Sequence, residues 1–265
     1  MRQQKKPSLR APSYSTNYPC VGLKRMCRQN SVALWLFFDV GETLLSEISF
    51  HSARNDGLFQ ILRAKRKDLT RDQYESCRRS AILTRPGGEA SRVRAIAREV
   101  LGAQDYYHAV QEYYERFGER LIEKFELEPN SMFRPYPEVG QVLQYLSKWH
   151  SLGIIANQHR NVRKHLENTW NISSYFKFMI LSEEVGFRKP DREIFLLALD
   201  RARAEPSDAW MIGDRVDTDV GPSRTLGMKA IRVLHDSEMS IIPPTIEEER
   251  PDFQFRDLKP LMNLF

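Results

Sequence analysis

The stretch LWLFFDVGETLL, residues 34–45, carries five apolar residues that run directly into the carboxylate of Asp39. Val40, Gly41 and Glu42 follow and have the character of a turn, and Thr43 comes after them. A short apolar run that ends at turn residues is typical of a buried strand. The run is far shorter than the ~20 residues of a membrane span, so we expect no membrane association. Taken alone, Asp39 fits a helix N-cap as well as a catalytic group.

The chain from residue 32 onward alternates between short apolar runs and helix-like segments. RNVRKHLENTW (160–170) and PDREIFLLALDRAR (190–203) are helix-like, and the second places Ile194, Leu197 and Ala198 on one helical face. Strands that alternate with helices of this length favour a parallel sheet with helices on both faces. We therefore expect an α/β fold with a doubly wound, Rossmann-like parallel-sheet core, whose strands are 32–38, 152–156, 177–181, 209–212 and 229–233.

The segment after the first strand contains no convincing strand and indicates an inserted helical unit. Its apolar patterns predict helices around 50–65, 70–83, 89–101 and 105–126. An all-helical insert of about 90 residues lies within the normal size of a domain. The predicted organisation is a basic tail (1–30), an α/β core (31–46 and 136–265) and a helical cap (47–135).

The charge of the chain is concentrated in its first 30 residues, which hold seven Lys or Arg and no Asp or Glu. The rest carries the remaining 33 of the 40 basic residues against all 35 acidic ones, so we expect no nucleic-acid partner. For the tail we keep three interpretations: disorder, a true start at Met26, or an organellar transit peptide. With Cys77 as the one cysteine of the body, a reducing, cytoplasmic location is expected, and organellar targeting stays open.

Polar residues follow the predicted strands at the points where the strands end. Asp39 follows the first strand, Asn157 the second and Lys189 the third, and Asp214 and Asp219 follow the fourth. Ligands of open parallel sheets bind outside the carboxyl ends of the strands, where these side chains would converge. The three aspartates and Lys189 each have a structural interpretation by themselves, as a cap or a solvated lysine, but a chance match of all four in this order is improbable.

Together these residues resemble the haloacid dehalogenase superfamily, most of whose members are phosphatases. The resemblance covers residues 32 to about 260, including the place of the helical cap. FFDVGETL (37–44) and GIIANQ (153–158) are similar to the first and second motifs of the superfamily. GFRKPDREIF (186–195) and IGDRVDTDVGPSRTLGM (212–228) match the third and fourth more closely.

The resemblance implies a reaction and a metal. Asp39 would attack phosphorus and form an aspartyl-phosphate, and Lys189 would place a positive charge against Asp39 and the transferred group. A Mg²⁺ would be held by Asp39, the backbone carbonyl of Gly41 and Asp214, with Asp219 orienting its waters. Gly41 and Asn157 would contact the substrate. We expect hydrolysis of a small phosphorylated metabolite, whose identity the sequence does not give; nor does it give the oligomeric state.

Two positions depart from the pattern of the superfamily, Asp-x-Asp-Gly-Thr in the first motif and Ser or Thr in the second. Gly41 replaces the second Asp, the general acid and base, and Ala156 replaces the hydroxyl residue. Loss of a general acid–base group typically lowers a rate ~10²–10⁴-fold. A catalytically weakened binding or regulatory protein and a dehalogenase-type hydrolase therefore stay open. The sequence favours Glu42 as a solvent-facing turn residue over a replacement acid.

Residues of the predicted cap can reach the same edge of the sheet. Glu47 and His51 follow the first motif closely enough to overhang the site, although a histidine here is more often a surface residue than a proton donor. Arg85, Arg92 or Arg94 is a candidate contact for a substrate anion, with a solvated helix face favoured for Arg92 and Arg94. No motif singles out any of them.

Overall fold

The computed structural model describes residues 33–84, 89–235 and 237–265. The predicted tail and Arg85 lie outside the described residues, as do the three interpretations of the tail. Within the described ranges, six strands form one parallel sheet in the order β5-β4-β1-β6-β7-β8. These strands are β1 (Trp35–Phe38), β4 (Ser151–Ala156), β5 (Phe178–Leu181), β6 (Ala209–Gly213), β7 (Lys229–Val233) and β8 (Phe253–Phe255). The predicted fold class, an α/β doubly wound parallel sheet, is confirmed.

All five predicted strands are present, with small shifts at their ends, and the sequence missed one further strand, β8. Two of the residues of β8 are exposed and it lies at the edge of the sheet, so it lacks the continuous apolar run of a central strand. Sequence reasoning also missed a short antiparallel pair, β2 (Leu45–Ser46) with β3 (Arg134–Pro135). This pair joins the helical segment to the core.

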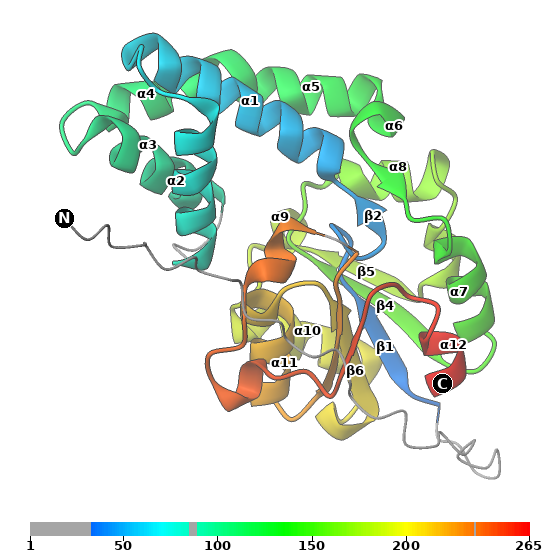
Figure 1. Cartoon of the computed structure of the whole chain (residues 1–265). Coiled ribbons are helices and arrows are strands. Elements are labelled where there is room, and N and C mark those ends of the chain that lie inside the picture. The colour runs from blue at the N-terminus through cyan, green and yellow to red at the C-terminus, as the bar shows by residue number, and fades with distance from the viewer. Residues whose placement is uncertain (1–32, 85–88, 236) are drawn as a thin grey trace, which may run out of the picture.

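Helices cover both faces of the sheet (Figure 1). Alternate residues of β1 explain this arrangement, because Leu36 and Phe38 belong to a hydrophobic cluster on one face and Phe37 to a cluster on the other. The first cluster is completed by α7 (Val139–Leu146), α8 (Asn161–Asn168) and α12 (Leu261–Leu264), and the second by α10 (Arg192–Ala202). The short helices α9 (Ser182–Val185) and α11 (Gly221–Thr225) lie after β5 and β6.

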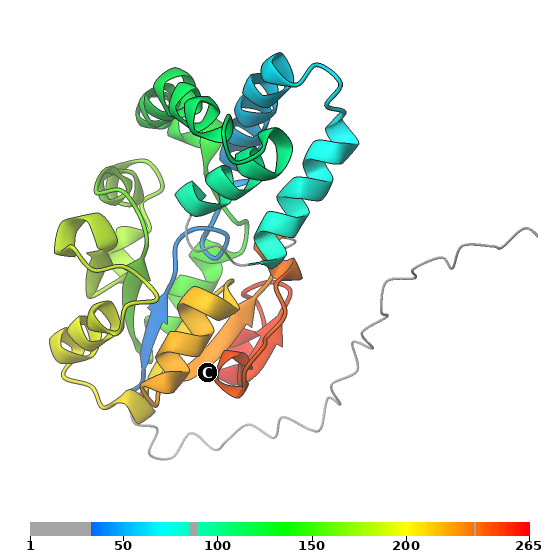
Figure 2. The ribbon, with the colours of Figure 1, turned by 90° about the vertical axis from the view of Figure 1, so that its left-hand side faces the viewer.

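The described residues between β2 and β3 form helices and their connections. They are α1 (Ile48–Lys65), α2 (Arg71–Leu83), α3 (Glu89–Leu101), α4 (Tyr106–Tyr113), α5 (Glu119–Leu127) and α6 (Pro129–Met132). The predicted helix 105–126 is interrupted by a π-helical turn, Tyr114–Gly118, which ends on a glycine of low helix propensity. Helices α1 to α4 share a hydrophobic cluster of their own, and Figures 1 and 2 show α1 to α5 gathered over one end of the sheet. The cap boundaries at 47 and 135 stay a prediction.

Among the described residues, no helix has the combination of length and apolar character needed to cross a membrane.

Candidate active site

Three aspartates meet at the carboxyl end of the sheet. Asp39 follows β1, Asp214 follows β6, and Asp219 lies in the π-helical turn Val216–Val220 that begins two residues later. One carboxylate oxygen from each lies within 4.8 Å of the others, and all three side chains are buried. Strands β1 and β6 are neighbours with Phe38 beside Ile212, which brings Asp39 and Asp214 to the same level of the sheet.

Lys189 connects two of these aspartates. Its Nζ atom donates to Oδ1 of Asp39 at 2.6 Å and to Oδ1 of Asp219 at 2.5 Å, and the lysine is 2% exposed. Asn157 fixes the lysine backbone, since its amide donates to the Lys189 carbonyl at 2.7 Å and accepts from the Lys189 N–H at 2.8 Å. The structure thus brings the predicted residues together, with the Asn157 side chain turned to Lys189; its contact with a substrate stays a prediction.

The cluster holds more negative charge than one lysine neutralises. Burial raises the pKa of Asp39 to about 6; Lys189 opposes this shift, whereas Asp219 adds to it. Burial, then Asp219 and Asp39, raise the pKa of Asp214 well above its ordinary value. For Lys189, burial lowers the pKa, but Asp219 and Asp39 outweigh burial and the net pKa is raised. The lysine is therefore charged at neutral pH, and the carboxylates repel one another.

This donor set fits a hard divalent cation. Buried carboxylate oxygens that converge within 4.8 Å are the ligands that Mg²⁺ prefers, and a cation would relieve their repulsion. Ser237, in the loop after β7, also contacts the cluster: its Oγ donates to Oδ2 of Asp214 at 3.2 Å. No sequence motif pointed to Ser237.

The two departures from the expected motifs lie at the carboxyl ends of neighbouring strands, Ala156 in β4 and Gly41 shortly after β1. Ala156 is the buried last residue of β4, and it brings no hydroxyl to the site. Gly41 has no positive φ, so its backbone does not require glycine. A Cβ atom at Gly41 would lie 2.5 Å from Oε1 of Glu47 and 3.2 Å from Nε2 of Gln158. The ends of the Glu47 and Gln158 side chains therefore lie in the space beside Gly41 and would have to move for a larger residue.

The expectation that Glu42 faces solvent is wrong. Glu42 is 5% exposed and has a positive φ of 52°. Its Oε2 accepts from the Tyr136 hydroxyl at 2.7 Å and its Oε1 accepts from the Glu47 N–H at 2.8 Å. The Tyr136 ring stacks on His235 with centroids 3.6 Å apart. Glu47 is a local partner, but Tyr136 lies 94 positions from Glu42 in the chain, which is why the local sequence did not predict the burial of Glu42. Burial raises the pKa of Glu42, although Tyr136 partly opposes this.

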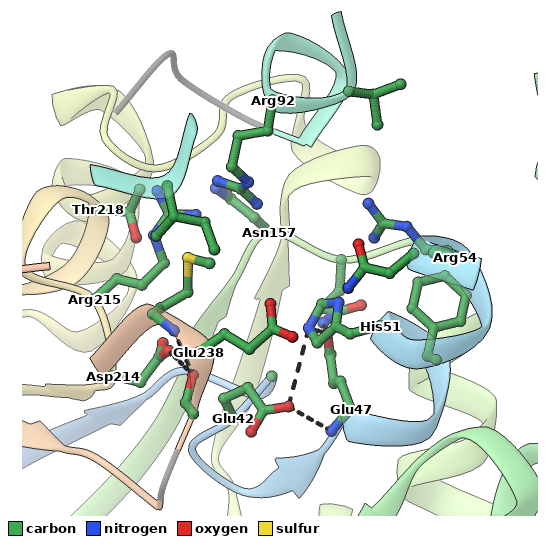
Figure 3. Close-up of a pocket in the computed structure, with 18 of the residues that line it drawn as sticks. Glu42, Glu47, His51, Arg54, Arg92, Asn157, Asp214, Arg215, Thr218 and Glu238 are labelled. Carbon is green, nitrogen blue, oxygen red and sulfur yellow. Dashed lines mark hydrogen bonds and ion pairs between the residues drawn. The ribbon is translucent and has the colours of Figure 1, made fainter. Parts of the chain in front are cut away.

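Glu47 and His51 lie at the start of α1, beside Glu42 (Figure 3). Oε1 of Glu47 accepts from Gln158 Nε2 at 2.7 Å, and Oε2 lies 3.5 Å from Nε2 of His51. Burial and then Glu42 raise the pKa of Glu47 to about 8. Burial and then Arg54 lower the pKa of His51 to about 3. Glu47 is thus largely protonated and His51 neutral near pH 7.

A cavity of about 320 Å³ opens over Asp39 and Asp214. Core residues line its floor, and α1, α2 and α3 contribute the opposite wall (Figure 3). The wall contains several arginines, and burial and then Arg215 lower the pKa of one of them, Arg92, to about 10. Arg94 is not among the lining residues. The lining arginines are Arg54, Arg78, Arg92, Arg188 and Arg215.

Comparison with known proteins agrees with this geometry. The sequence profile described as haloacid dehalogenase-like hydrolase matches residues 91–233, more than half of the chain. The chain belongs to the haloacid dehalogenase-like hydrolase family. The resemblance stated from the motifs is confirmed.

Relatives of this haloacid dehalogenase-like hydrolase include named phosphatases. It is 23% identical over 214 residues to a glyceraldehyde 3-phosphate phosphatase of Methanopyrus kandleri, covering 72% of this chain and 88% of the relative. It is 25% identical to a pyrimidine 5′-nucleotidase of Escherichia coli, covering 80% and 91%. The crystal structure of a Bacillus subtilis hydrolase of the family, bound to magnesium, superimposes with a TM-score of 0.60 at 21% identity, covering 88% and 99%. That likeness establishes the fold.

Proposed function

We propose that this hydrolase cleaves a small phosphorylated metabolite in a Mg²⁺-dependent reaction through an aspartyl-phosphate on Asp39. The observation that carries the proposal is the buried bridge of Lys189 between Asp39 and Asp219, beside Asp214. Residues 47–135 would act as a cap over this site.

The proposed hydrolysis has two steps, in which Asp39 and Lys189 have separate roles. An oxygen of Asp39 attacks phosphorus while the bond from phosphorus to the leaving oxygen breaks. Lys189 keeps its charge next to Asp39 and stabilises negative charge on the transferred group. Water then attacks phosphorus, the bond to Asp39 breaks, and phosphate leaves. Gly41 and Asn157 are the proposed contacts to the substrate.

Asp39, the Gly41 carbonyl and Asp214 would hold the Mg²⁺, with Asp219 supporting its waters. When bound, the cation lets an anionic carboxylate approach an anionic phosphate and neutralises charge in the transition state.

The cavity suits a small anionic substrate. Its volume of about 320 Å³ lies at the small end of ligand sites, and arginines of the helical wall face the same space as the aspartates. Glyceraldehyde 3-phosphate and a pyrimidine 5′-monophosphate are the first candidates, because two relatives carry those names.

A binding or regulatory protein is the second candidate, favoured by the missing hydroxyl at Ala156 and the missing carboxyl at Gly41. A dehalogenase-type reaction is the third. The donor set of three aspartates and a lysine favours phosphate-ester hydrolysis over the dehalogenase-type reaction, because phosphate chemistry needs a cation at the site.

The test is phosphate release from 4-nitrophenyl phosphate, glyceraldehyde 3-phosphate, a pyrimidine 5′-monophosphate and a wider set of metabolites, each with Mg²⁺ or with EDTA. We expect Mg²⁺-dependent turnover that Asp39→Asn abolishes. Absence of turnover on every ester, together with binding of a phosphorylated compound, would favour the binding protein. Halide release from a 2-haloacid without Mg²⁺ would favour the dehalogenase.

A further inference from the structure

The carboxyl group of Glu47 occupies the place of a side chain that residue 41 does not have. A Cβ atom at Gly41 would lie 2.5 Å from Oε1 and 2.8 Å from Cδ of Glu47. Since Gly41 lacks a positive φ, the backbone conformation permits a side chain there, and the Glu47 carboxyl lies where that side chain would begin. Gly41 lies two residues after Asp39, so Glu47 reaches the position next to the proposed nucleophile from the start of α1.

The Glu47 carboxyl is held there by residues from separate parts of the fold. Gln158 is the second residue after β4, and its Nε2 atom donates to Oε1 of Glu47 at 2.7 Å. His51, one turn along α1, lies 3.5 Å from Oε2. The Glu47 N–H donates to Glu42, which is itself held by Tyr136. A carboxyl held by a hydrogen bond to one of its oxygens and by a hydrogen bond from its own backbone N–H is preorganised for a defined contact.

The neighbouring carboxylate of Glu42 is less suited to the same task. Both of its oxygens accept hydrogen bonds, from Glu47 N–H and from the Tyr136 hydroxyl, and its main-chain oxygen lies 3.2 Å from Nδ1 of His235. Glu42 is therefore a positioning residue that fixes the loop and the start of α1.

We propose that Glu47 is the general acid and base of this hydrolase, replacing the carboxyl group absent from position 41. This inference rests on the proposed phosphate-ester hydrolysis. In the first half-reaction, Asp39 bonds to phosphorus, the ester bond breaks, and the leaving oxygen takes the proton of Glu47. In the second, Glu47 takes a proton from the attacking water as the bond from phosphorus to Asp39 breaks. The sum is ester plus water giving alcohol plus phosphate.

The test separates the two half-reactions by leaving group. An activated aryl leaving group needs no proton, so Glu47→Gln should still form the aspartyl-phosphate from 4-nitrophenyl phosphate but hydrolyse it slowly. Rapid mixing with Mg²⁺ should show a burst of 4-nitrophenol, about one per protein, followed by slow turnover. On the best alkyl phosphate of the screen, Glu47→Gln should lose about 10²–10⁴-fold in rate with no burst of alcohol.

Controls make the outcomes distinct. Glu123→Gln, at an exposed glutamate of α5, should match the wild type, and Asp39→Asn should give no burst. Where Glu47→Gln melts below the assay temperature, Glu47→Asp replaces it, because it keeps a carboxyl on a side chain that is one methylene shorter. Glu47→Asp should cleave the alkyl phosphate more slowly than the wild type, with a burst of 4-nitrophenol from the aryl phosphate like that of the wild type.

Two results would overturn the assignment of Glu47 alone: alkyl phosphate turnover by Glu47→Gln within about threefold of the wild type, or a folded Glu47→Gln protein with no aryl burst. A wild type that cleaves no phosphate ester, including 4-nitrophenyl phosphate with Mg²⁺, would overturn the proposed function and this inference together.

Discussion

Lys189 and Asp219 lie 30 positions apart in the chain, yet Nζ of the lysine donates to Oδ1 of the aspartate at 2.5 Å. The two side chains are 2% and 1% exposed, so neither is solvated by bulk water. A buried ion pair contributes little net stability, but removal of one partner leaves a buried charge without its counter-charge. Removal of Lys189 would therefore leave two buried carboxylates, Asp39 and Asp219, without their counter-charge.

Lys189→Met should destabilise the Mg²⁺-free protein by about 3–5 kcal/mol, because the carboxylates of Asp39 and Asp219 lose their counter-charge. Urea unfolding in EDTA measures the change. Lys124→Met, at an exposed lysine of α5, is the matched control and should shift stability by less than about 0.5 kcal/mol. Equal stability of Lys189→Met and the wild type would contradict the buried bridge.

Mg²⁺ should raise the melting temperature of the wild type, because a ligand that binds the native state alone stabilises that state. Asp214→Asn should remove this shift, since it deletes one of the three converging carboxylates. Asp200→Asn, at an exposed residue of α10, should keep it. A scan with no shift at millimolar Mg²⁺, or an equal shift in Asp214→Asn, would count against the metal site.

Glu47→Gln should stabilise the Mg²⁺-free protein in alkaline but not in acidic solution. The pKa of Glu47 rises from 4.5 to about 8 on folding. Below pH 4.5 the carboxyl is protonated in both states, and the variant should match the wild type. As the pH rises toward about 8, the unfolded chain has released its proton and the folded chain still holds it. The wild type then loses up to roughly 1.4 kcal/mol per pH unit, which the variant does not.

Urea midpoints of both proteins from pH 4.5 to 9, in EDTA, measure this difference. Glu123→Gln should show a flat difference across the same range. A difference for Glu47→Gln that shrinks as the pH rises would show the opposite sign of the pKa shift.

Gly41→Asp should destabilise the protein by about 1–3 kcal/mol, because the new side chain would start 2.5 Å from the Glu47 carboxyl. In a Glu47→Ala background the same substitution should be better tolerated, with a coupling of about 0.5–3 kcal/mol. Unfolding of the four proteins of this cycle measures the coupling. Additive effects would show that the two positions do not compete for one space.

Much of the core could be predicted from the sequence, because its signals are local. The apolar run before Asp39 becomes β1, and the alternation of strands and helices identified the parallel sheet. The convergence of Asp39, Asn157 and Asp214 follows from the sheet topology, since parallel strands bring their carboxyl ends to one edge. Edge strand β8 was missed because its exposed residues carry no apolar run.

What only the tertiary structure decided is where the carboxyl groups beside Asp39 lie. By sequence, Glu42 has the character of an exposed turn residue and Glu47 is one acidic residue before a helix. Burial of Glu42 depends on Tyr136, 94 positions away, and the contact of Glu47 with Gln158 spans 111 positions. A pattern of residue types fixes periodicity and strand ends, but a contact across such separations exists only once the chain has folded. The sequence therefore shows only that position 41 has no carboxyl group, whereas the structure shows that the carboxyl of Glu47 lies beside it.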